Sequence, residues 1–248
     1  MNRRAWLTSA GAAMTSLILA GCNKITEAPG VVKVLASAEV LNRRVQRTFG
    51  RTALAREFTR ADITSNFKAN GTIDPPDADY KALAAGGFAD WRLVVDGLVE
   101  RPLSLTLDQV RALPSRTQIT RHDCVEGWSS IGEWSGARLA PLIAMAGLKP
   151  EAKHLVLHCA DTLGGAKYYE TLDLVDVTHP QTILAYAMNG APLTVAHGAP
   201  LRLRAERYLG YKQAKYIMRL EAVDGFAHIG GGQGGYWEDQ GYDRYGGI

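Results

Sequence analysis

Short apolar segments separated by glycine, proline and asparagine dominate the chain from residue 91 onward, and they restrict the folds that it can adopt. Residues 91–99, 154–159 and 216–223 have the length and the apolar composition of strands. Residues 186–193 contain Asn189-Gly190, a hairpin signal between two extended pieces. Such segments predict sheets built from many short strands.

Two short helices are expected between these strands. Thr106 and Gln109 form a capping box, and Pro114 ends the helix that it starts. Residues 139–148 repeat apolar side chains at helical spacing, which indicates a face turned to the core. The sequence therefore predicts an α+β fold, a single mixed domain of short strands with few short helices.

The chain divides into four stretches. We expect an export signal over residues 1–21 and an irregular arm that begins with a lipidated cysteine over 22–85, with a short helix near residues 54–60. The domain core follows over 86–228, and a tail rich in glycine and aromatic residues occupies 229–248.

The N-terminus has the features of an export signal. Arg3-Arg4 resembles a twin-arginine pair, and the apolar run over residues 10–20 is shorter than the ~20 residues that a membrane-spanning helix needs. Leu19-Ala20-Gly21-Cys22 resembles a bacterial lipobox, so Cys22 would carry lipid. A plain secretory leader with a chance cysteine is the alternative. Either way we expect a periplasmic protein, and the lipobox predicts one anchored to a membrane by lipid alone.

The charge balance argues against nucleic acid as a partner. Without Arg3 and Arg4, the count of Lys and Arg falls from 28 to 26 against 25 acidic residues, a net charge of about +1. No basic run with interleaved aromatic residues is present. We expect a monomer that binds no nucleic acid.

The segment "TRHDCVEGWSSIGEWSG" (residues 120–136) holds one of three cysteines in the chain among charged and aromatic residues. Arg121 and His122 would lower the pKa of Cys124, and the thiolate is the form that attacks a substrate or binds a metal. Three alternatives stay open: a disulfide with Cys159, a cysteine hydrolase that uses His122, and a surface ion pair of Arg121 with Asp123 or Glu126 in place of a catalytic role.

A second segment, "HGAPLRLRAERYLGYKQAKYI" (residues 197–217), carries basic residues in a strand-like alternation. Arg202 and Arg204 share one face, and Gly210 would allow the backbone to approach a ligand closely. Guanidinium, ammonium and backbone N–H groups together suit a phosphate-bearing ligand. The alternative is a solvated strand face.

Together, "RHDCVEGWS" and this second segment resemble the molybdopterin-binding domain of the sulfite oxidase family, over about residues 58–223. The resemblance is greatest to exported single-domain bacterial members related to periplasmic protein-methionine-sulfoxide reductase catalytic subunits. It implies the family fold and a Mo-molybdopterin cofactor, with Cys124 as the metal ligand. It also implies cofactor contacts in three further segments. These contacts are Asn66, Lys68 and Asn70 in "SNFKANG", Cys159 with Asp161 as the second choice, and His197, Arg202, Gly210, Tyr211 and Lys212.

The resemblance implies an exported oxidoreductase that moves an oxygen atom and two electrons, with Cys124 and Arg121 as catalytic residues. Reduction of a sulfoxide or N-oxide, small or protein-bound, is the first expectation. Sulfite oxidation, or a lipid-anchored binding module without catalysis, is the alternative. The chain has no haem-binding motif and no dimerisation domain of the family, so we expect a separate electron-transfer partner such as a membrane haem protein or a cytochrome.

Overall fold

The computed structural model describes residues 28–50 and 52–248, and the chain separates into two units, 1–51 and 52–248. In the first unit, helix α2 (Pro29–Phe49) begins with a proline, which the first helical turn tolerates. The expected irregular arm is therefore wrong for these residues. Arg3-Arg4, the lipobox and Cys22 lie outside the described residues. Within the described ranges, no helix is both long and apolar enough to cross a membrane.

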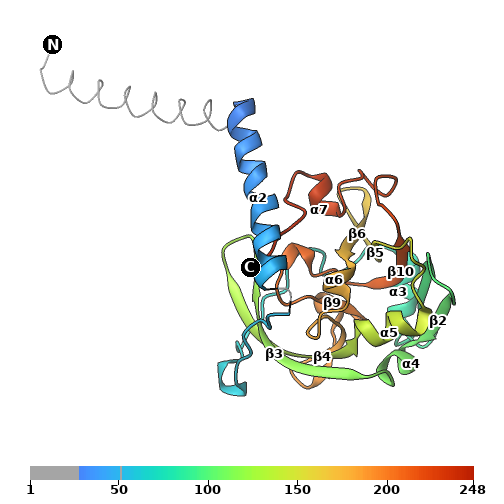
Figure 1. Cartoon of the computed structure of the whole chain (residues 1–248). Coiled ribbons are helices and arrows are strands. Elements are labelled where there is room, and N and C mark those ends of the chain that lie inside the picture. Colours follow the sequence, from blue (N-terminus) through green and yellow to red (C-terminus); the bar gives the residue numbers. More distant parts are fainter. Residues whose placement is uncertain (1–27, 51) are drawn as a thin grey trace, which may run out of the picture. The chain divides into compact units, whose positions relative to one another are not determined.

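The second unit is built on two sheets, one mixed and one antiparallel, with several short helices (Figure 1). One sheet has the order β2-β1-β10-β5-β6, in which only the β1–β10 pair is parallel. The other has the order β3-β4-β7-β8, and β9 also pairs with β7. The strands are β1 (Arg92–Gly97), β2 (Leu103–Thr106), β3 (Ser115–Asp123), β4 (Ser129–Arg138), β5 (His154–Leu163), β6 (Ala166–Asp173), β7 (Ile183–Met188), β8 (Ala191–Pro192), β9 (Arg202–Arg204) and β10 (Ile217–Val223).

The helices of this unit are short, as expected. The α-helices are α3 (Ala78–Ala85), α4 (Leu107–Arg111), α5 (Leu139–Ala146), α6 (Leu174–Val177) and α7 (Tyr236–Asp239). Single 3-10 turns are η1 (Arg60–Asp62), η2 (Val195–His197) and η3 (Gly210–Lys212). The capping box at Thr106 and Gln109 forms as predicted, with both reciprocal hydrogen bonds present. The apolar face of α5 is also confirmed, because Leu139, Leu142, Ile143 and Ala146 are all buried.

Both sheets contribute to one apolar core. Leu155 and Leu157 of β5 pack in the same cluster as Leu184 of β7 and Leu203 of β9, together with the buried face of α5. Gly136 allows β4 and β7 to approach at a register shift, because a Cβ there would lie 2.4 Å from the carbonyl oxygen of Leu184. The two sheets therefore fold as one domain.

The segment that precedes the core runs along the β3–β4 hairpin, the long pair at the lower edge of Figure 1. Glu57 forms a bridge with Thr120, and the backbone N–H of Thr64 donates to the carbonyl of Ile131 at 3.0 Å. Phe67 then packs edge-on against Trp134, with ring centroids 5.3 Å apart. The expected helix at residues 54–60 is wrong, because this segment is extended until η1. The extended path carries Asn70 to the end of β3, where the site lies.

Candidate active site

A cavity of about 140 Å³ lies where segments distant in sequence meet. Its walls come from the arm, the loop after β3, the end of β5, β6, β9, η3 and the C-terminal tail. The lining residues are Asn70, Gly71, Thr72, Cys124, Val125, Glu126, Asp161, Leu163, Tyr168, Arg202, Gly210, Tyr211, Gln213, Lys215, Trp237 and Tyr242. Of the predicted site residues, the structure brings Asn70, Cys124, Arg202, Gly210 and Tyr211 together here.

Cys124 follows the last residue of β3, in a tight loop that leads into β4. Its backbone N–H donates to Trp128 at 2.9 Å, and Gly127 closes the loop with a positive φ of 85°. The side-chain amide of Asn70 donates to the Cys124 sulfur at 3.3 Å. Burial raises the pKa of the thiol, although a hydrogen bond from the backbone at Glu126 opposes this change. The predicted lowering of the Cys124 pKa by Arg121 and His122 is therefore wrong.

Arg121 and His122 lie on opposite faces of β3 because side chains alternate along a strand. Arg121 is 55% exposed and its guanidinium pairs with Asp123 at 2.8 Å, the surface pair that we considered as an alternative. It does not line the cavity, so its expected catalytic role is not supported by its position. His122 is buried, and burial together with Arg204 lowers its pKa well below the usual range. Neutral His122 accepts a hydrogen bond from Arg204 through Nδ1 at 2.9 Å. A cysteine hydrolase would need a free base beside Cys124, so this contact argues against that alternative.

Two cations in the cavity wall have no carboxylate partner within ion-pair distance among the described residues. Arg202 is 4% exposed, donates to the His197 carbonyl at 3.0 Å, and has an Nε without a hydrogen-bond partner. Lys215 donates only to carbonyl oxygens, including that of Asn70 at 2.8 Å. Burial, together with neighbouring cations, lowers the pKa of Arg202 to about 9 and that of Lys215 to about 7. Both shifts show that this part of the cavity favours a bound anion.

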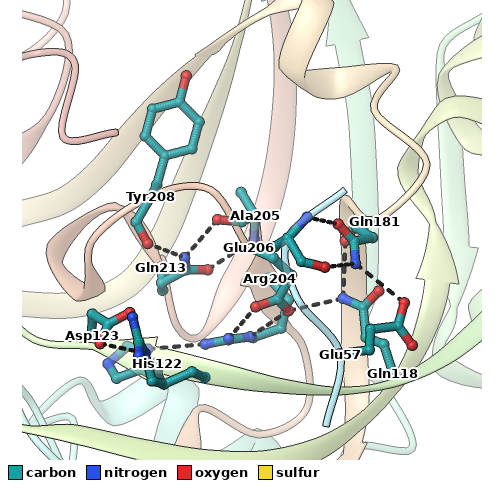
Figure 2. Close-up of polar contacts among 12 residues, drawn as sticks. Glu57, Gln118, His122, Asp123, Gln181, Arg204, Ala205, Glu206, Tyr208 and Gln213 are labelled. Atoms are coloured by element: carbon teal, nitrogen blue, oxygen red, sulfur yellow. Dashed lines mark hydrogen bonds and ion pairs between the residues drawn. The ribbon is translucent and has the colours of Figure 1, made fainter. Parts of the chain in front are cut away.

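A buried polar network fixes β9 and the loop that follows it (Figure 2). Arg204 and Glu206 form an ion pair at 2.5 Å with both side chains fully buried, and Gln118 of β3 donates to Glu206 at 2.8 Å. Gln213 accepts from the backbone of Ala205 at 2.9 Å and donates back to it at 2.8 Å (Figure 2). The predicted alternation of Arg202 and Arg204 is confirmed, but the strand face is buried and not solvated.

The Gly210-Tyr211-Lys212 turn reaches the cavity through its first two residues only. A Cβ at Gly210 would lie 2.7 Å from the His122 ring, so glycine is required for packing on His122. Lys212 points away from the cavity, is 1% exposed, and contacts Glu170 at 2.5 Å and also Glu238. The structure does not support Lys212 as a direct cofactor contact.

The remaining predicted contacts are divided between different places. Asn66 and His197 line a separate cavity of about 280 Å³, beside Phe67, whose carbonyl lies 3.2 Å from His197 Nε2. Lys68 is exposed and pairs at 3.4 Å with Glu126, which lies in the loop that holds Cys124. These three residues are therefore near the cavity that holds Cys124 but outside its wall.

Cys159 packs in the apolar core and does not reach the cavity. It is a free cysteine, as is Cys124, so the disulfide alternative is wrong. A register shift in the β5–β6 pairing follows His158, and Asp161 beyond it lines the cavity in place of Cys159. One carboxylate oxygen of Asp161 has no partner, and burial raises its pKa.

The cavity residues that were not predicted as site residues include Lys215, Tyr168, Trp237 and Tyr242. Lys215 lies within the basic segment 197–217, whose composition indicates an anion-binding role, whereas no sequence pattern marks Tyr168. Trp237 and Tyr242 belong to the glycine and aromatic tail, whose composition is unusual but which contacts the site only in three dimensions. A buried thiol, and two cations that have no carboxylate partner among the described residues, line one cavity, as expected of a protein that binds an anionic ligand beside a thiol.

Comparisons with known proteins agree with this class. The chain matches the model of the oxidoreductase molybdopterin binding domain over residues 81–227. It is 37% identical over 246 residues to the putative protein-methionine-sulfoxide reductase subunit YedZ1 of Azospira oryzae, covering 99% of this chain and 87% of that protein. It is 30% identical over 203 residues to the uncharacterized oxidoreductase YuiH of Bacillus subtilis, covering 80% and 93%.

More distant matches extend the same family. The chain is 32% identical over 223 residues to the protein-methionine-sulfoxide reductase catalytic subunit MsrP of Xanthomonas axonopodis, covering 84% of this chain and 66% of that protein. The solved structure of the sulfane dehydrogenase SoxCD from Paracoccus pantotrophus matches with a TM-score of 0.50 and 28% identity, over 55% of this chain and 39% of that one. The chain belongs to the oxidoreductase molybdopterin-binding family and has its α+β fold, as the sequence predicted.

Proposed function

We propose that this oxidoreductase holds a Mo-molybdopterin cofactor in the cavity and reduces sulfoxides. The observation that carries the proposal is the convergence of the Cys124 thiol with Arg202 and Lys215 in one cavity. When bound, the cofactor supplies two-electron oxygen-atom transfer, in which a sulfoxide gains two electrons and two protons and yields a thioether and water.

The residues present fit such a cofactor. Thiolates are suitable ligands for a soft metal–sulfur centre, and coordination deprotonates a thiol whatever its pKa in the free protein. Arg202 has an unpartnered Nε and Lys215 has only carbonyl acceptors, so a phosphate would supply the missing negative charge. Asp161 has a free carboxylate oxygen that would accept from an amine of the pterin.

The chain's own residues would bind and orient. Asn70 donates to the Cys124 sulfur and would fix the direction of its lone pairs toward the metal. The Arg204–Glu206 pair and Gln118 hold β9 so that Arg202 stays buried in the cavity wall. Cys124 is the proposed metal ligand, and Arg202 and Lys215 are the proposed phosphate contacts.

Reduction of a sulfoxide is favoured over sulfite oxidation by the position of Arg121. An anionic substrate needs a cation beside the metal, and Arg121, the candidate near Cys124 in sequence, pairs with Asp123 on the exposed face. The names of the relatives, which include protein-methionine-sulfoxide reductase subunits, support a methionine sulfoxide side chain as the substrate. The word subunit in those names also supports a separate protein as the electron donor.

We propose in addition that the chain is exported and lipid-anchored through Cys22, which the sequence Leu19-Ala20-Gly21-Cys22 after Arg3-Arg4 supports. Cells grown with radiolabelled palmitate should label the wild-type chain. The variant Cys22→Ser should carry no label, and equal labelling of the two would contradict the anchor.

The experiment that tests the proposed function joins metal analysis with a substrate panel. Protein purified from a host that makes molybdopterin should contain close to one molybdenum per chain. It should also reduce sulfoxides with reduced viologen as the electron donor. Cys124→Ala should lose the activity, whereas Cys159→Ala should keep it, because Cys159 lies in the core. Molybdenum-free wild-type protein would end the proposal, and loaded protein inert to sulfoxides, N-oxides and sulfite would favour a binding module.

A further inference from the structure

The C-terminal tail, residues 229–248, supplies an aromatic part of the cavity wall. Trp237 of α7 and Tyr242 line the cavity together with Tyr211 of η3. The ring centroids of Trp237 and Tyr242 are 5.1 Å apart, and those of Tyr211 and Tyr242 are 5.2 Å apart. Three rings from two segments therefore form one continuous surface in the cavity that also holds Cys124.

Buried contacts hold the start of this aromatic surface in place. Glu238, next to Trp237 in α7, is paired with Lys212, and both side chains are 1% exposed. Asp239 accepts from the Tyr169 hydroxyl at 2.8 Å. Gly235 also forms a backbone bridge with Glu170 of β6. Helix α7 is therefore fixed to β6 and to η3.

The far end of the tail is fixed as well. The backbone N–H of Leu209 donates to Gly246 at 2.8 Å, and Tyr208 forms a bridge with Gly247. The Tyr211 hydroxyl donates to the Asp243 carbonyl at 2.7 Å. Because both ends are attached to the domain, Trp237 and Tyr242 keep defined positions in the wall.

The charges of the cavity are unevenly divided between its lining segments. Of the two cations, Arg202 belongs to β9, and Lys215 lies in the short segment between η3 and β10. The Cys124 loop contributes the carboxylate of Glu126, which accepts a hydrogen bond from Trp128 at 2.8 Å and pairs with Lys68 at 3.4 Å. The aromatic rings of the wall carry no charge that would attract an anion, and a thioether sulfur packs favourably against such rings.

We propose that Trp237 and Tyr242 are specificity-determining residues that limit access to Cys124 and select a neutral, apolar sulfoxide or thioether group. The choice of sulfoxide rests on the proposed function, whereas the control of access to the thiol does not. The two parts are therefore tested by separate measurements.

Access is tested on the full chain purified without cofactor from a host that cannot make molybdopterin, with Cys22→Ser in every variant. The probe is iodoacetamide, and mass spectrometry of the Cys124 peptide follows the rate. Trp237→Ala and Tyr242→Ala should each raise the alkylation rate about tenfold, because the reaction depends on access to the thiol. Tyr242 is 38% exposed, so its truncation tests the wall even if Trp237→Ala does not fold.

Two matched variants control for loosening of the tail. Tyr245→Ala removes another ring of the tail, which packs on Tyr208 and does not line the cavity, and Trp237→Phe keeps a ring in the wall. Both should alkylate at the wild-type rate, with Cys159 unreactive throughout. Wild-type rates in Trp237→Ala and Tyr242→Ala, or an equal increase in Tyr245→Ala, would overturn the proposal.

Selectivity is tested on the loaded enzyme. Tyr242→Ala should lower kcat/KM for methyl p-tolyl sulfoxide relative to dimethyl sulfoxide about fivefold, with molybdenum content unchanged, because the aryl group loses an aromatic contact. An unchanged ratio would overturn the selective role. If no sulfoxide is reduced at all while alkylation responds as expected, the proposed function fails and the control of access stands.

Discussion

The domain buries two kinds of cation, and they differ in what surrounds them. Arg204 and Lys212 each contact carboxylates, Arg204 with Glu206 and Lys212 with two glutamates. Arg202 is also buried and Lys215 is partly buried, yet their polar contacts among the described residues are carbonyl oxygens. The neighbours Arg202 and Arg204 on one strand thus have opposite electrostatic surroundings.

This difference separates structure from binding. A buried ion pair holds elements together, because removal of one partner leaves the other charge uncompensated. A buried cation without a counter-charge destabilises the free protein, and an anionic ligand relieves that cost. Arg204 and Lys212 therefore hold elements of the domain together, while Arg202 and Lys215 have the surroundings expected of the proposed anion-binding part of the cavity.

The largest effect on stability is expected when Arg204 is replaced, and replacement of Arg202 tests the distinction between the two arginines. Arg204→Met should lower the free energy of unfolding by about 3–5 kcal/mol, because Glu206 would stay buried without its partner. Arg202→Met should change it by less than about 1 kcal/mol in cofactor-free protein, because no carboxylate loses a partner. Urea unfolding of the two variants measures both values. Equal losses would contradict the distinction.

The pH dependence of stability should separate the buried triad of Lys212, Glu170 and Glu238 from the partly buried pair of Arg219 and Glu221. Burial raises the pKa of Glu170, and Glu238 adds to this while Lys212 opposes it. The folded chain therefore keeps a proton on Glu170 that the unfolded chain loses above about pH 4.5. The contribution of Glu170 to the free energy of unfolding is full below that pH and falls as the pH rises, by up to ~1.4 kcal/mol per pH unit. Glu170→Gln should flatten this slope in urea unfolding between pH 5 and 8.

Glu221→Gln is the matched control for that measurement. Burial opposes the change, but hydrogen bonds and charges of His158 and Arg219 lower the pKa of Glu221. Its contribution is present above its unfolded pKa and is lost as the pH falls, which is the opposite slope. A Glu170→Gln variant that follows the wild-type curve would show that the triad is not strained by its second carboxylate.

Anion binding to the cofactor-free protein should sharpen the comparison further. Lys215 has a pKa of about 7 in the free protein, so above that pH a bound anion must be accompanied by uptake of a proton. Sulfate affinity, measured by calorimetry, should therefore fall about tenfold per pH unit above 7. Lys215→Met should bind sulfate more weakly and without this pH dependence, whereas Lys212→Met should keep it. An unchanged pH profile in Lys215→Met would remove Lys215 from the site.

The smallest effect is expected outside the buried clusters. Arg121→Ala removes an exposed pair with Asp123, which contributes about 0–1 kcal/mol at most. Viologen-linked kcat and KM of the loaded variant should stay within about twofold of the wild type, because its guanidinium does not line the cavity. A loss of kcat above tenfold would restore the catalytic role that the sequence suggested.

Local sequence patterns predicted the structural features that depend only on residues adjacent in the chain. Three such features are confirmed: the capping box at Thr106, the hairpin turn at Asn189-Gly190, and the position of Arg202 and Arg204 on one face of β9. Each of them depends on a few adjacent residues. Arg121 shows the limit of this reasoning. It is three residues from Cys124, but the pleat of β3 turns it to the exposed face.

The unpredicted part of the site depends on contacts between distant residues. Lys212 meets Glu170 and Glu238, at separations of 42 and 26 residues, and no local pattern indicates that pairing. The choice between Cys159 and Asp161 depends on a register shift in the β5–β6 pairing, which the sequence of β5 alone does not show. The family resemblance predicted part of the cavity lining, such as Cys124 and Arg202, whereas Lys215, Trp237 and Tyr242 could be placed there only from the fold.

The place of the aromatic wall in the chain has a consequence for biosynthesis. Residues 229–248 leave the ribosome after every other segment of the cavity, because synthesis runs from the N-terminus. The Cys124 loop, β9 and η3 can therefore assemble while Trp237 and Tyr242 are still absent. The wall that Trp237 and Tyr242 form is therefore the last part of the cavity to be completed during synthesis.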